Sequence, residues 1–369
     1  MDRANTAHSE GSSAFAKPGE QESQAADPRS GAESSTAGAQ RREGVSKAAE
    51  LELQHVSKSY PGRREPAIAD LSFTVPAGEV CVLVGPSGSG KTTAMRLINR
   101  MISISAGDIL LGGHSVLRRD ARELRREIGY VIQQIGLFPH QTVKENIATV
   151  PGLLGWSKER TAARVDELLA LIGLDPEEMS DRYPAQLSGG QRQRVGVARA
   201  LAADPPLMLM DEPFGAIDPI NRTRLQDEFL ALQEKVRKTI VFVTHDIDEA
   251  IKMGDRIAIL REGGKLAQYD TPREILTHPA DEFVAQFVGA DRGIKRLSLT
   301  TLAEMKLLEP NGLQPGGLRA PGQTSVRDAL SMIISANGEP LAVVDGEDQI
   351  QGLLTLSLIE RLLAEEGAA

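Results

Sequence analysis

Three short hydrophobic runs dominate the pattern of this chain, at Val80–Val84, Leu207–Met210 and Thr239–Val243. They are continuous rather than alternating, which is typical of strands that are buried on both faces of a parallel sheet. Helix-compatible sequence follows the first run, at Thr93–Arg100. The alternation of strands and helices over residues 49–290 predicts an α/β fold built on a parallel sheet.

The polar sequence after the first run contains a phosphate-binding motif. Residues Gly85–Thr93 read GPSGSGKTT and match the pattern G-x-x-x-x-G-K-[ST]. Backbone N–H groups of such a loop converge on phosphate oxygens at the N-terminus of the following helix. The alternative is a glycine-serine turn without a ligand, which the full match and the flanking strand and helix disfavour. We therefore expect nucleotide contacts from Gly85, Pro86, Ser87, Gly88, Ser89, Gly90, Lys91, Thr92 and Thr93.

The other two runs end in polar residues with complementary chemistry. Asp211 and Glu212 follow the second run, and His245 follows the third. Asp211 is suited to hold Mg²⁺ together with the Thr92 hydroxyl, and Glu212 is suited to polarise an attacking water as a general base. His245 is expected to contact the γ-phosphate or to orient Glu212. A solvated acidic turn and an ordinary surface histidine are the alternatives, and the ordered combination with the phosphate loop disfavours both.

A further motif restricts the class of protein. Leu187–Gln191 reads LSGGQ and lies between the phosphate loop and the acidic strand. With these motifs in this order, the chain resembles the ATPase subunit of ATP-binding cassette (ABC) transporters over about Leu51–Gly289. The resemblance implies a P-loop ABC ATPase domain with a parallel sheet core, an antiparallel edge subdomain and a helical subdomain at about Leu137–Ala203.

The resemblance also implies roles for individual residues. Tyr60 is expected to stack on adenine, and Gln133 to take part in catalysis by sensing Mg²⁺ and the membrane partner. Asp218 falls in the loop that crosses to the opposing subunit. The signature residues open a helix whose N–H groups form a second anion-binding surface, and the resemblance assigns that surface to the ATP of another chain. The signature set is Ser188, Gly189, Gly190 and Gln191, so each ATP is expected to be closed between two copies of a homodimer.

Composition and charge limit the classes of partner and the location that we expect for this chain. No run approaches the roughly 18–20 apolar residues that a membrane-spanning helix needs, and we expect a peripheral protein on the cytoplasmic face of the cell membrane. The single cysteine, Cys81, falls inside an apolar run and is expected to be a core residue. A net charge of -9 argues against general nucleic-acid binding. Separate membrane permease subunits and a solute-binding protein are the partners that the resemblance implies.

The two ends of the chain differ from the ATPase region. Residues 1–48 are rich in Ser, Ala, Gly and Gln and are expected to be a disordered tail. Residues 291–320 are expected to be a linker to a small α+β module at 321–369. Within the module we expect helices at Val326–Ala336 and Leu356–Leu363 and strands at Leu341–Val344 and Ile350–Leu354.

This module resembles a single cystathionine-β-synthase (CBS) module. A lone copy would pair across a homodimer or with a degenerate partner in Leu297–Leu318. From Pro321 onward the chain carries two basic and eight acidic residues, which would make docking to a charged surface dependent on salt. Two interpretations remain open: the module senses nucleotide or ionic strength, or it is a dimerising appendage.

The solute is indicated by weaker similarities. The runs Gln133–His140, Phe214–Ile220 and Gln268–Pro272 look like the glycine betaine/proline/choline branch of importers. None of these residues would touch the solute, so this inference rests on similarity to that branch and not on a solute-binding site. The alternatives are an importer ATPase for another small solute and, from a different class, a soluble ABC protein that works on DNA or ribosomes. The single phosphate loop and single signature disfavour the second alternative.

Overall fold

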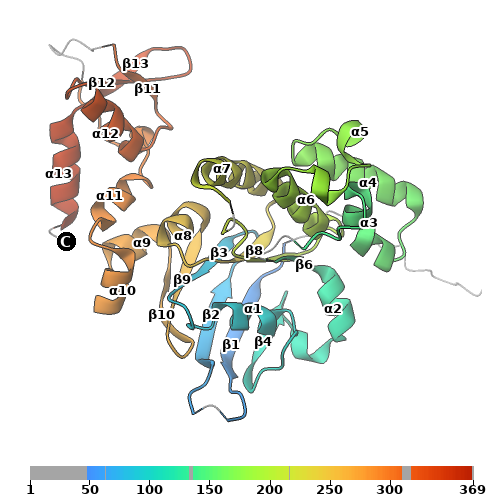
Figure 1. The fold of residues 1–369 in the computed structure, drawn as a ribbon. Helices are drawn as coiled ribbons and strands as arrows, with labels where there is room; N and C mark the ends of the chain where they lie inside the picture. The colour runs from blue at the N-terminus through green and yellow to red at the C-terminus, as the bar shows by residue number, and fades with distance from the viewer. Residues whose placement is uncertain (1–47, 63, 133–135, 216, 310–316, 368–369) are drawn as a thin grey trace, which may run out of the picture. The chain divides into compact units, whose positions relative to one another are not determined.

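The computed structural model describes residues 48–62, 64–132, 136–215, 217–309 and 317–367. The predicted tail at 1–48 therefore lies almost wholly outside the described residues. Figure 1 shows a large twisted sheet with helices packed around it. The strand order in this sheet is β5-β4-β1-β2-β10-β9-β3-β8-β7-β6.

The sheet joins a parallel and an antiparallel part. Strands β6, β7, β8, β3 and β9 pair in parallel, whereas β1 pairs antiparallel with β2 and β4. This confirms the expected parallel core with an antiparallel edge. The strands are β1 (Leu51–Lys58), β2 (Ile68–Val75), β3 (Val80–Val84), β4 (Ala106–Leu111), β5 (His114–Ser115), β6 (Ile128–Val131), β7 (Leu207–Asp211), β8 (Thr239–Val243), β9 (Arg256–Arg261) and β10 (Lys265–Asp270).

Strand β3 is buried on both faces, as its continuous apolar run predicts. Val80, Val82 and Val84 belong to one buried hydrophobic cluster, while Cys81 and Leu83 belong to a second cluster on the opposite face. The thiol of Cys81 is fully buried and free. Because side chains alternate between faces along a strand, the two clusters lie on the two sides of the sheet.

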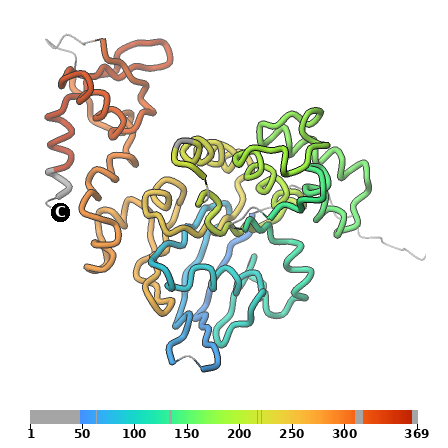
Figure 2. Tube along the Cα trace, viewed as in Figure 1, coloured from blue at the N-terminus to red at the C-terminus, as the bar shows by residue number. Residues whose placement is uncertain are grey.

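Helices cover the sheet and form a separate group at the β6 edge. Figure 2 shows this group as the green coils, which correspond to the predicted helical subdomain. Its members are α3 (Val143–Leu153), α4 (Lys158–Leu171), α5 (Pro176–Met179), the 3-10 turn η2 (Pro184–Gln186) and α6 (Gly189–Leu201). The other helices of this region are α1 (Lys91–Ile98), η1 (Val116–Arg118), α2 (Ala121–Glu127), α7 (Pro219–Val236), α8 (Ile247–Met253), α9 (Pro272–Thr277) and α10 (Glu282–Val288).

The C-terminal segment forms a small α+β unit with its own buried cluster. Its elements are α11 (Arg292–Leu297), η3 (Leu302–Glu304), β11 (Arg319–Pro321), α12 (Val326–Ser335), β12 (Leu341–Val344), β13 (Ile350–Leu354) and α13 (Leu356–Gly367). Both predicted strands are confirmed, and α12 ends one residue earlier than predicted. Leu297 and Leu302, expected in a linker, belong to the buried cluster of this unit together with Ala320. These three residues are part of the unit because their apolar side chains fill its core.

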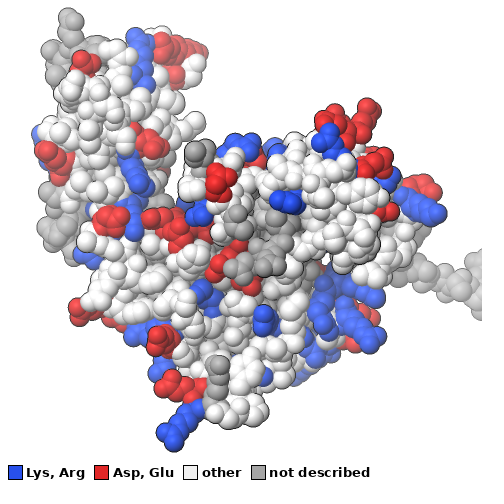
Figure 3. Space-filling view, viewed as in Figure 1, with Lys and Arg blue, Asp and Glu red and all other residues white. Residues whose placement is uncertain are grey.

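Charged side chains are mixed over the visible surface. Figure 3 shows a local gathering of basic residues over the region of α2, and acidic and basic side chains interspersed elsewhere on this face. Arg118 and Arg125 are exposed, and Arg119 and Arg126 are partly buried. Within the described part of the chain, no helix combines the length and the apolar character that crossing a membrane requires.

Candidate functional site

The three motif-bearing strands are direct neighbours in the sheet. β3 pairs in parallel with β8, and β8 pairs in parallel with β7. Since the carboxyl ends of parallel strands meet at one edge, the phosphate loop, the acidic pair and the histidine come together there (Figure 1). Backbone hydrogen bonds join the loops: Thr244 N–H donates to Leu83 O at 3.2 Å, and Glu212 N–H donates to Val243 O at 2.9 Å.

The phosphate loop depends on glycine at two positions for different reasons. Gly88 has φ +83°, and an added Cβ would meet nothing within 4 Å, so its backbone faces open space. Gly90 has φ +89°, and its Cβ would lie 2.6 Å from Ile68 Cδ1 and 2.7 Å from Ala67 O. A side chain at Gly90 would therefore both strain the backbone and clash. The loop presents backbone to a ligand on one side and packs against β2 on the other.

Lys91 is held inside the loop. Its Nζ donates to the carbonyl oxygens of Gly85 at 2.8 Å and Pro86 at 2.9 Å. Burial lowers the pKa of Lys91, and the carboxylates of Glu212 and Asp211 oppose that shift. An ammonium group that is bonded to neutral carbonyls keeps its full charge for an anionic ligand, and an anion in the loop would offset its burial.

Thr92 and Asp211 lie within reach of each other. The Thr92 hydroxyl donates to Asp211 Oδ1 at 3.4 Å, although the two residues are separated by 119 positions. Burial, and then the neighbouring Glu212, raise the pKa of Asp211. One hydroxyl and one carboxylate suit Mg²⁺, which takes oxygen ligands and usually completes its shell with waters and substrate phosphates. The described residues contain no cluster of three or more metal-binding side chains, so phosphate oxygens would have to complete such a site.

Glu212 and His245 form a close pair. His245 Nδ1 lies 3.2 Å from Glu212 Oε1, and the Glu212 side chain is 22% exposed. Glu212 has a φ of 44°, a left-handed conformation that is uncommon for residues other than glycine. Strained backbone of this kind is often found at functional sites. The arrangement brings together the predicted base and the predicted histidine.

A cavity of about 1130 Å³ lies over the phosphate loop. Tyr60 lines it, and Lys58 Nζ lies 4.9 Å from the centroid of the Tyr60 ring. The cavity is large enough for a nucleotide. The sequence reasoning missed the contributions of Arg64, Glu65 and Glu262, which line the cavity from the turns after β1 and β9. A cluster of charged residues close to Tyr60 was the available signal for the first two.

The signature forms the start of α6. Ser188 is the N-cap: its Oγ accepts from Gln191 N–H at 3.2 Å, and Gln191 Oε1 accepts from Ser188 N–H at 2.9 Å. An added Cβ on Gly189 would meet nothing within 4 Å. The capping box uses the Gln191 N–H, whereas the N–H groups of Gly189 and Gly190 have no acceptor within the helix. None of the described residues 188–191 is among those that line the nucleotide cavity.

Of the two remaining predicted site residues, the structure describes Asp218 but not Gln133. Asp218 caps α7, since its carboxylate accepts from Asn221 N–H at 3.1 Å and from Asn221 Nδ2 at 2.8 Å. Asp218 does not line the nucleotide cavity of its own chain. Gln133 lies outside the described residues, although β6, which precedes it, pairs with β7.

The sequence matches a family model described as "ABC transporter" over residues 68–215. The osmoprotectant import ATP-binding protein OsmV of Salmonella typhimurium is 46% identical over 82% of this chain and 78% of its own length. The glycine betaine/carnitine/choline transport ATP-binding protein OpuCA of Bacillus subtilis is 46% identical over 84% of this chain and 80% of its own. The chain belongs to the ATP-binding subunits of ABC transporters.

A solved structure supports this membership at the level of the fold. A dimeric ATP-binding cassette in a post-hydrolysis state, bound to ADP and Pi, matches with a TM-score of 0.53 and 34% sequence identity. The match covers 60% of this chain and 98% of that chain. The ABC subunit described here is therefore an ATP-binding ATPase, which confirms the expected fold and enzyme class. The resemblance of its C-terminal unit to a CBS module stays a prediction.

Proposed function

We propose that this chain is the ATP-hydrolysing subunit that energises import of a compatible solute of the glycine betaine, proline or choline type. Relatives that are about 46% identical over most of the chain carry names for osmoprotectant and for glycine betaine, carnitine and choline transport. The single structural observation that carries the hydrolytic part is the convergence of Lys91, Asp211, Glu212 and His245 at one sheet edge.

The binding step uses the phosphate loop. We infer that the N–H groups of Gly88 and Gly90 and the ammonium of Lys91 bind the β- and γ-phosphates, while Tyr60 stacks on the base. The Thr92 hydroxyl and the Asp211 carboxylate would hold Mg²⁺, which neutralises charge on the phosphates when bound. Their 3.4 Å separation is compatible with two ligands of one small cation.

The hydrolytic step uses the pair at the ends of β7 and β8. Glu212 would accept a proton from the attacking water, and His245 would orient Glu212 or contact the γ-phosphate. Their 3.2 Å contact and the partial burial of Glu212 support this division of roles. Gln133 is assigned to the same step as the residue that senses Mg²⁺ and the membrane partner.

The signature acts on the nucleotide of a second copy. Ser188, Gly189 and Gly190 lie outside the nucleotide cavity of their own chain, and the similar solved cassette is a dimer. Two ATP molecules would therefore join two chains, with Asp218 at the crossing loop. Closure would drive the permease from one facing state to the other, and hydrolysis would reset it.

The other components of the proposed transporter are separate chains. We infer integral membrane permease subunits, a solute-binding protein, and a peripheral position on the cytoplasmic face of the cell membrane. The ATPase domain is assigned to about residues 49–290, and the C-terminal unit to regulation by nucleotide or ionic strength or to dimerisation.

Reconstitution of the complete importer tests the proposal. ATP hydrolysis should rise when solute-binding protein and glycine betaine, proline or choline are supplied together, and should not rise with an unrelated amino acid. Stimulation by none of the three solutes would refute the substrate class and leave the ATPase assignment intact.

A further inference from the structure

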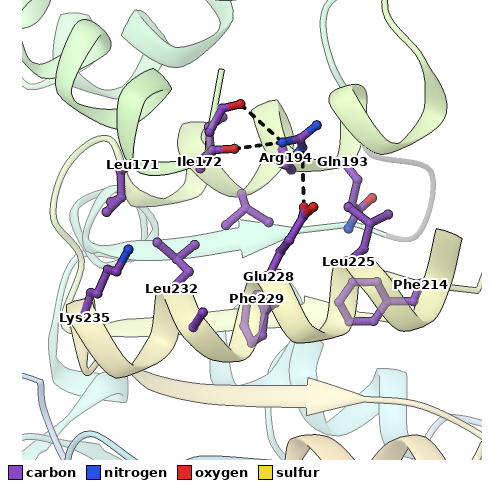
Figure 4. Close-up of a pocket in the computed structure, with 13 residues that line it drawn as sticks. Leu171, Ile172, Gln193, Arg194, Phe214, Leu225, Glu228, Phe229, Leu232 and Lys235 are labelled. Atoms are coloured by element: carbon purple, nitrogen blue, oxygen red, sulfur yellow. Dashed lines mark hydrogen bonds and ion pairs between the residues drawn. The ribbon is translucent and has the colours of Figure 1, made fainter. Parts of the chain in front are cut away.

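A second cavity lies away from the nucleotide, between the end of α4 and the helices α6 and α7. It has a volume of about 290 Å³, close to the lower limit for small-molecule sites. Figure 4 shows it as a crevice between helices that bear apolar side chains. No described residue lines both this cavity and the nucleotide cavity. Its apolar walls come mainly from Leu171, Val197, Phe214, Leu225, Phe229 and Leu232.

One of the residues that line this cavity has a buried polar atom without a partner. Gln193 is only 3% exposed, yet its Nε2 has no hydrogen-bond partner. In Figure 4 its side chain reaches from α6 toward Leu225 of α7. The Nε of Arg194 and the Oε2 of Glu228 also lack hydrogen bonds, and these two atoms lie 3.8 Å apart. Arg194 and Glu228 form an ion pair with each other, whereas Gln193 Nε2 is left with no partner. Since nearly all buried polar groups in folded proteins are bonded, this nitrogen is a donor available to a ligand at the cavity.

The charges around the cavity favour an anionic occupant. Arg194 and Lys235 contribute two positive charges to the lining and Glu228 one negative charge. Glu228 is already paired, with Arg194 at 3.8 Å and with Arg224 at 3.5 Å. Glu228 therefore balances the charge of Arg194, Lys235 leaves the lining with one net positive charge, and the unpartnered Gln193 nitrogen is a hydrogen-bond donor. The lining therefore calls for a hydrogen-bond acceptor with negative charge, attached to an apolar body.

The Arg194 side chain is fixed in place by the backbone of the turn that follows α4. Its Nη1 donates to Ile172 O at 3.1 Å and to Gly173 O at 3.4 Å. Its Nε lies 3.8 Å from Glu228 Oε2 of α7, so the guanidinium is held between this turn and α7. A side chain that is held in place in this way costs little reorganisation when a ligand binds beside it.

We propose that this cavity is a binding site for a small amphipathic monocarboxylate, whose carboxylate accepts from Gln193 Nε2 beside Arg194 and whose apolar body lies between α6 and α7. Helices α6 and α7 connect this cavity to the region proposed to bind nucleotide. α6 begins at the signature, and α7 begins at Asp218. An occupant would fix the spacing of these helices and thereby change the rate of ATP hydrolysis, a coupling that rests on the function proposed above.

Binding of octanoate to the full-length ATPase, measured by calorimetric titration, tests the site. Octanoate should bind at least tenfold more tightly than octylammonium, which has the same apolar body and the opposite charge. Gln193→Leu keeps a buried side chain of similar size but removes the donor. It should weaken octanoate at least fivefold and leave octan-1-ol unchanged.

A matched pair of variants locates the site. Ala231 is exposed and lines the cavity, whereas Glu234 is exposed on the same helix and does not. Ala231→Trp should abolish octanoate binding, and Glu234→Trp should preserve it, with unchanged thermal unfolding as the check on folding. No octanoate binding at millimolar concentration, or equal binding by both tryptophan variants, would overturn the site and mean that the cavity holds water. Binding that leaves ATP hydrolysis by the importer unchanged would overturn the coupling. Because binding is measured without hydrolysis, failure of the proposed function is distinguishable from failure of the site.

Discussion

At the scale of single residues, Glu212 is the clearest test of the chemistry. Replacing it with Gln keeps the shape and a hydrogen-bonding partner for His245 but removes the base. Hydrolysis should fall by about 10²- to 10⁴-fold, the usual contribution of general base catalysis, while ATP binding by the nucleotide site is retained. Single-turnover hydrolysis and equilibrium ATP binding measure the two effects. Rapid hydrolysis by this variant would remove Glu212 from the role of base.

Asp211 should show a conflict between function and stability. Burial and Glu212 raise its pKa, so the folded protein favours the protonated carboxyl, and stability is lost as pH rises through that raised pKa. Asp211→Asn should therefore raise the Tm of the nucleotide-free protein at pH 7, by about 2 °C at most, and should reduce Mg²⁺-dependent hydrolysis. The gain in Tm should shrink as the pH falls through the raised pKa of Asp211, because the native carboxyl then becomes protonated. A Tm that is lower at pH 7 would contradict this account.

At the scale of elements, Lys295 connects α11 to α8, the helix that follows His245. Its Nζ donates to Val288 O at 2.7 Å and lies 3.3 Å from Asp248 of α8 and 3.1 Å from Asp291. The Lys295 side chain is 10% exposed, so its loss leaves a carbonyl and two carboxylates without their donor. Lys295→Met should lower the free energy of unfolding by about 1–3 kcal/mol.

Lys252 provides the matched control for this prediction. It pairs with Asp227 at 2.7 Å on a more exposed surface. Lys252→Met should change the free energy of unfolding by less than about 1 kcal/mol, as is usual for surface ion pairs. Denaturant unfolding of both variants makes the comparison, and equal losses would refute the special position of Lys295.

The sequence predicted those elements whose side-chain pattern is unambiguous. Val80–Val84 and Thr239–Val243 are continuous apolar runs, and both strands have the predicted bounds. Strand β11, by contrast, is three residues long and ends in a proline, so nothing local marks it as a strand. Strand β10 is partly exposed along most of its length without strict alternation. β11 depends on parallel pairing with β12, which is more distant in the sequence and which a local pattern cannot indicate. β10 pairs with the preceding strand β9, and its mixed exposure hides it from a search for alternation.

The candidate site likewise contains residues that the sequence predicted and residues that it did not. Lys91, Asp211 and Glu212 fall in motifs whose spacing reflects their chemistry, and the structure places them at one edge of the sheet. Arg64 and Glu65 line the same cavity only because the turn between β1 and β2 folds over the phosphate loop. Residues whose role depends on the path of the chain through space carry no motif of their own.

At the scale of the whole molecule, mixed dimers test whether one site is shared by two chains. Lys91→Ala and Gly189→Trp should each abolish hydrolysis as homodimers. If the signature serves the ATP of the partner chain, a dimer with one chain of each has one site in which an intact Lys91 meets an intact signature. Random mixing should therefore restore about one quarter of the wild-type single-turnover hydrolysis, because half the dimers then hold one intact site of two. Complete inactivity of the mixture would indicate that the signature serves its own chain.

Because the Cys81 thiol in β3 is buried, the proposed closure of two chains around ATP can be followed directly with labels on an added cysteine. Cys81 is the chain's single cysteine, and burial raises its pKa far above the usual range, so the reactive thiolate is absent at neutral pH. The native protein should take up no maleimide, and the unfolded protein should take up one equivalent per chain. Spin labels or fluorophores can therefore be attached at an added cysteine near the start of α6 without replacing Cys81, and the distance between two labelled copies would then report closure in solution.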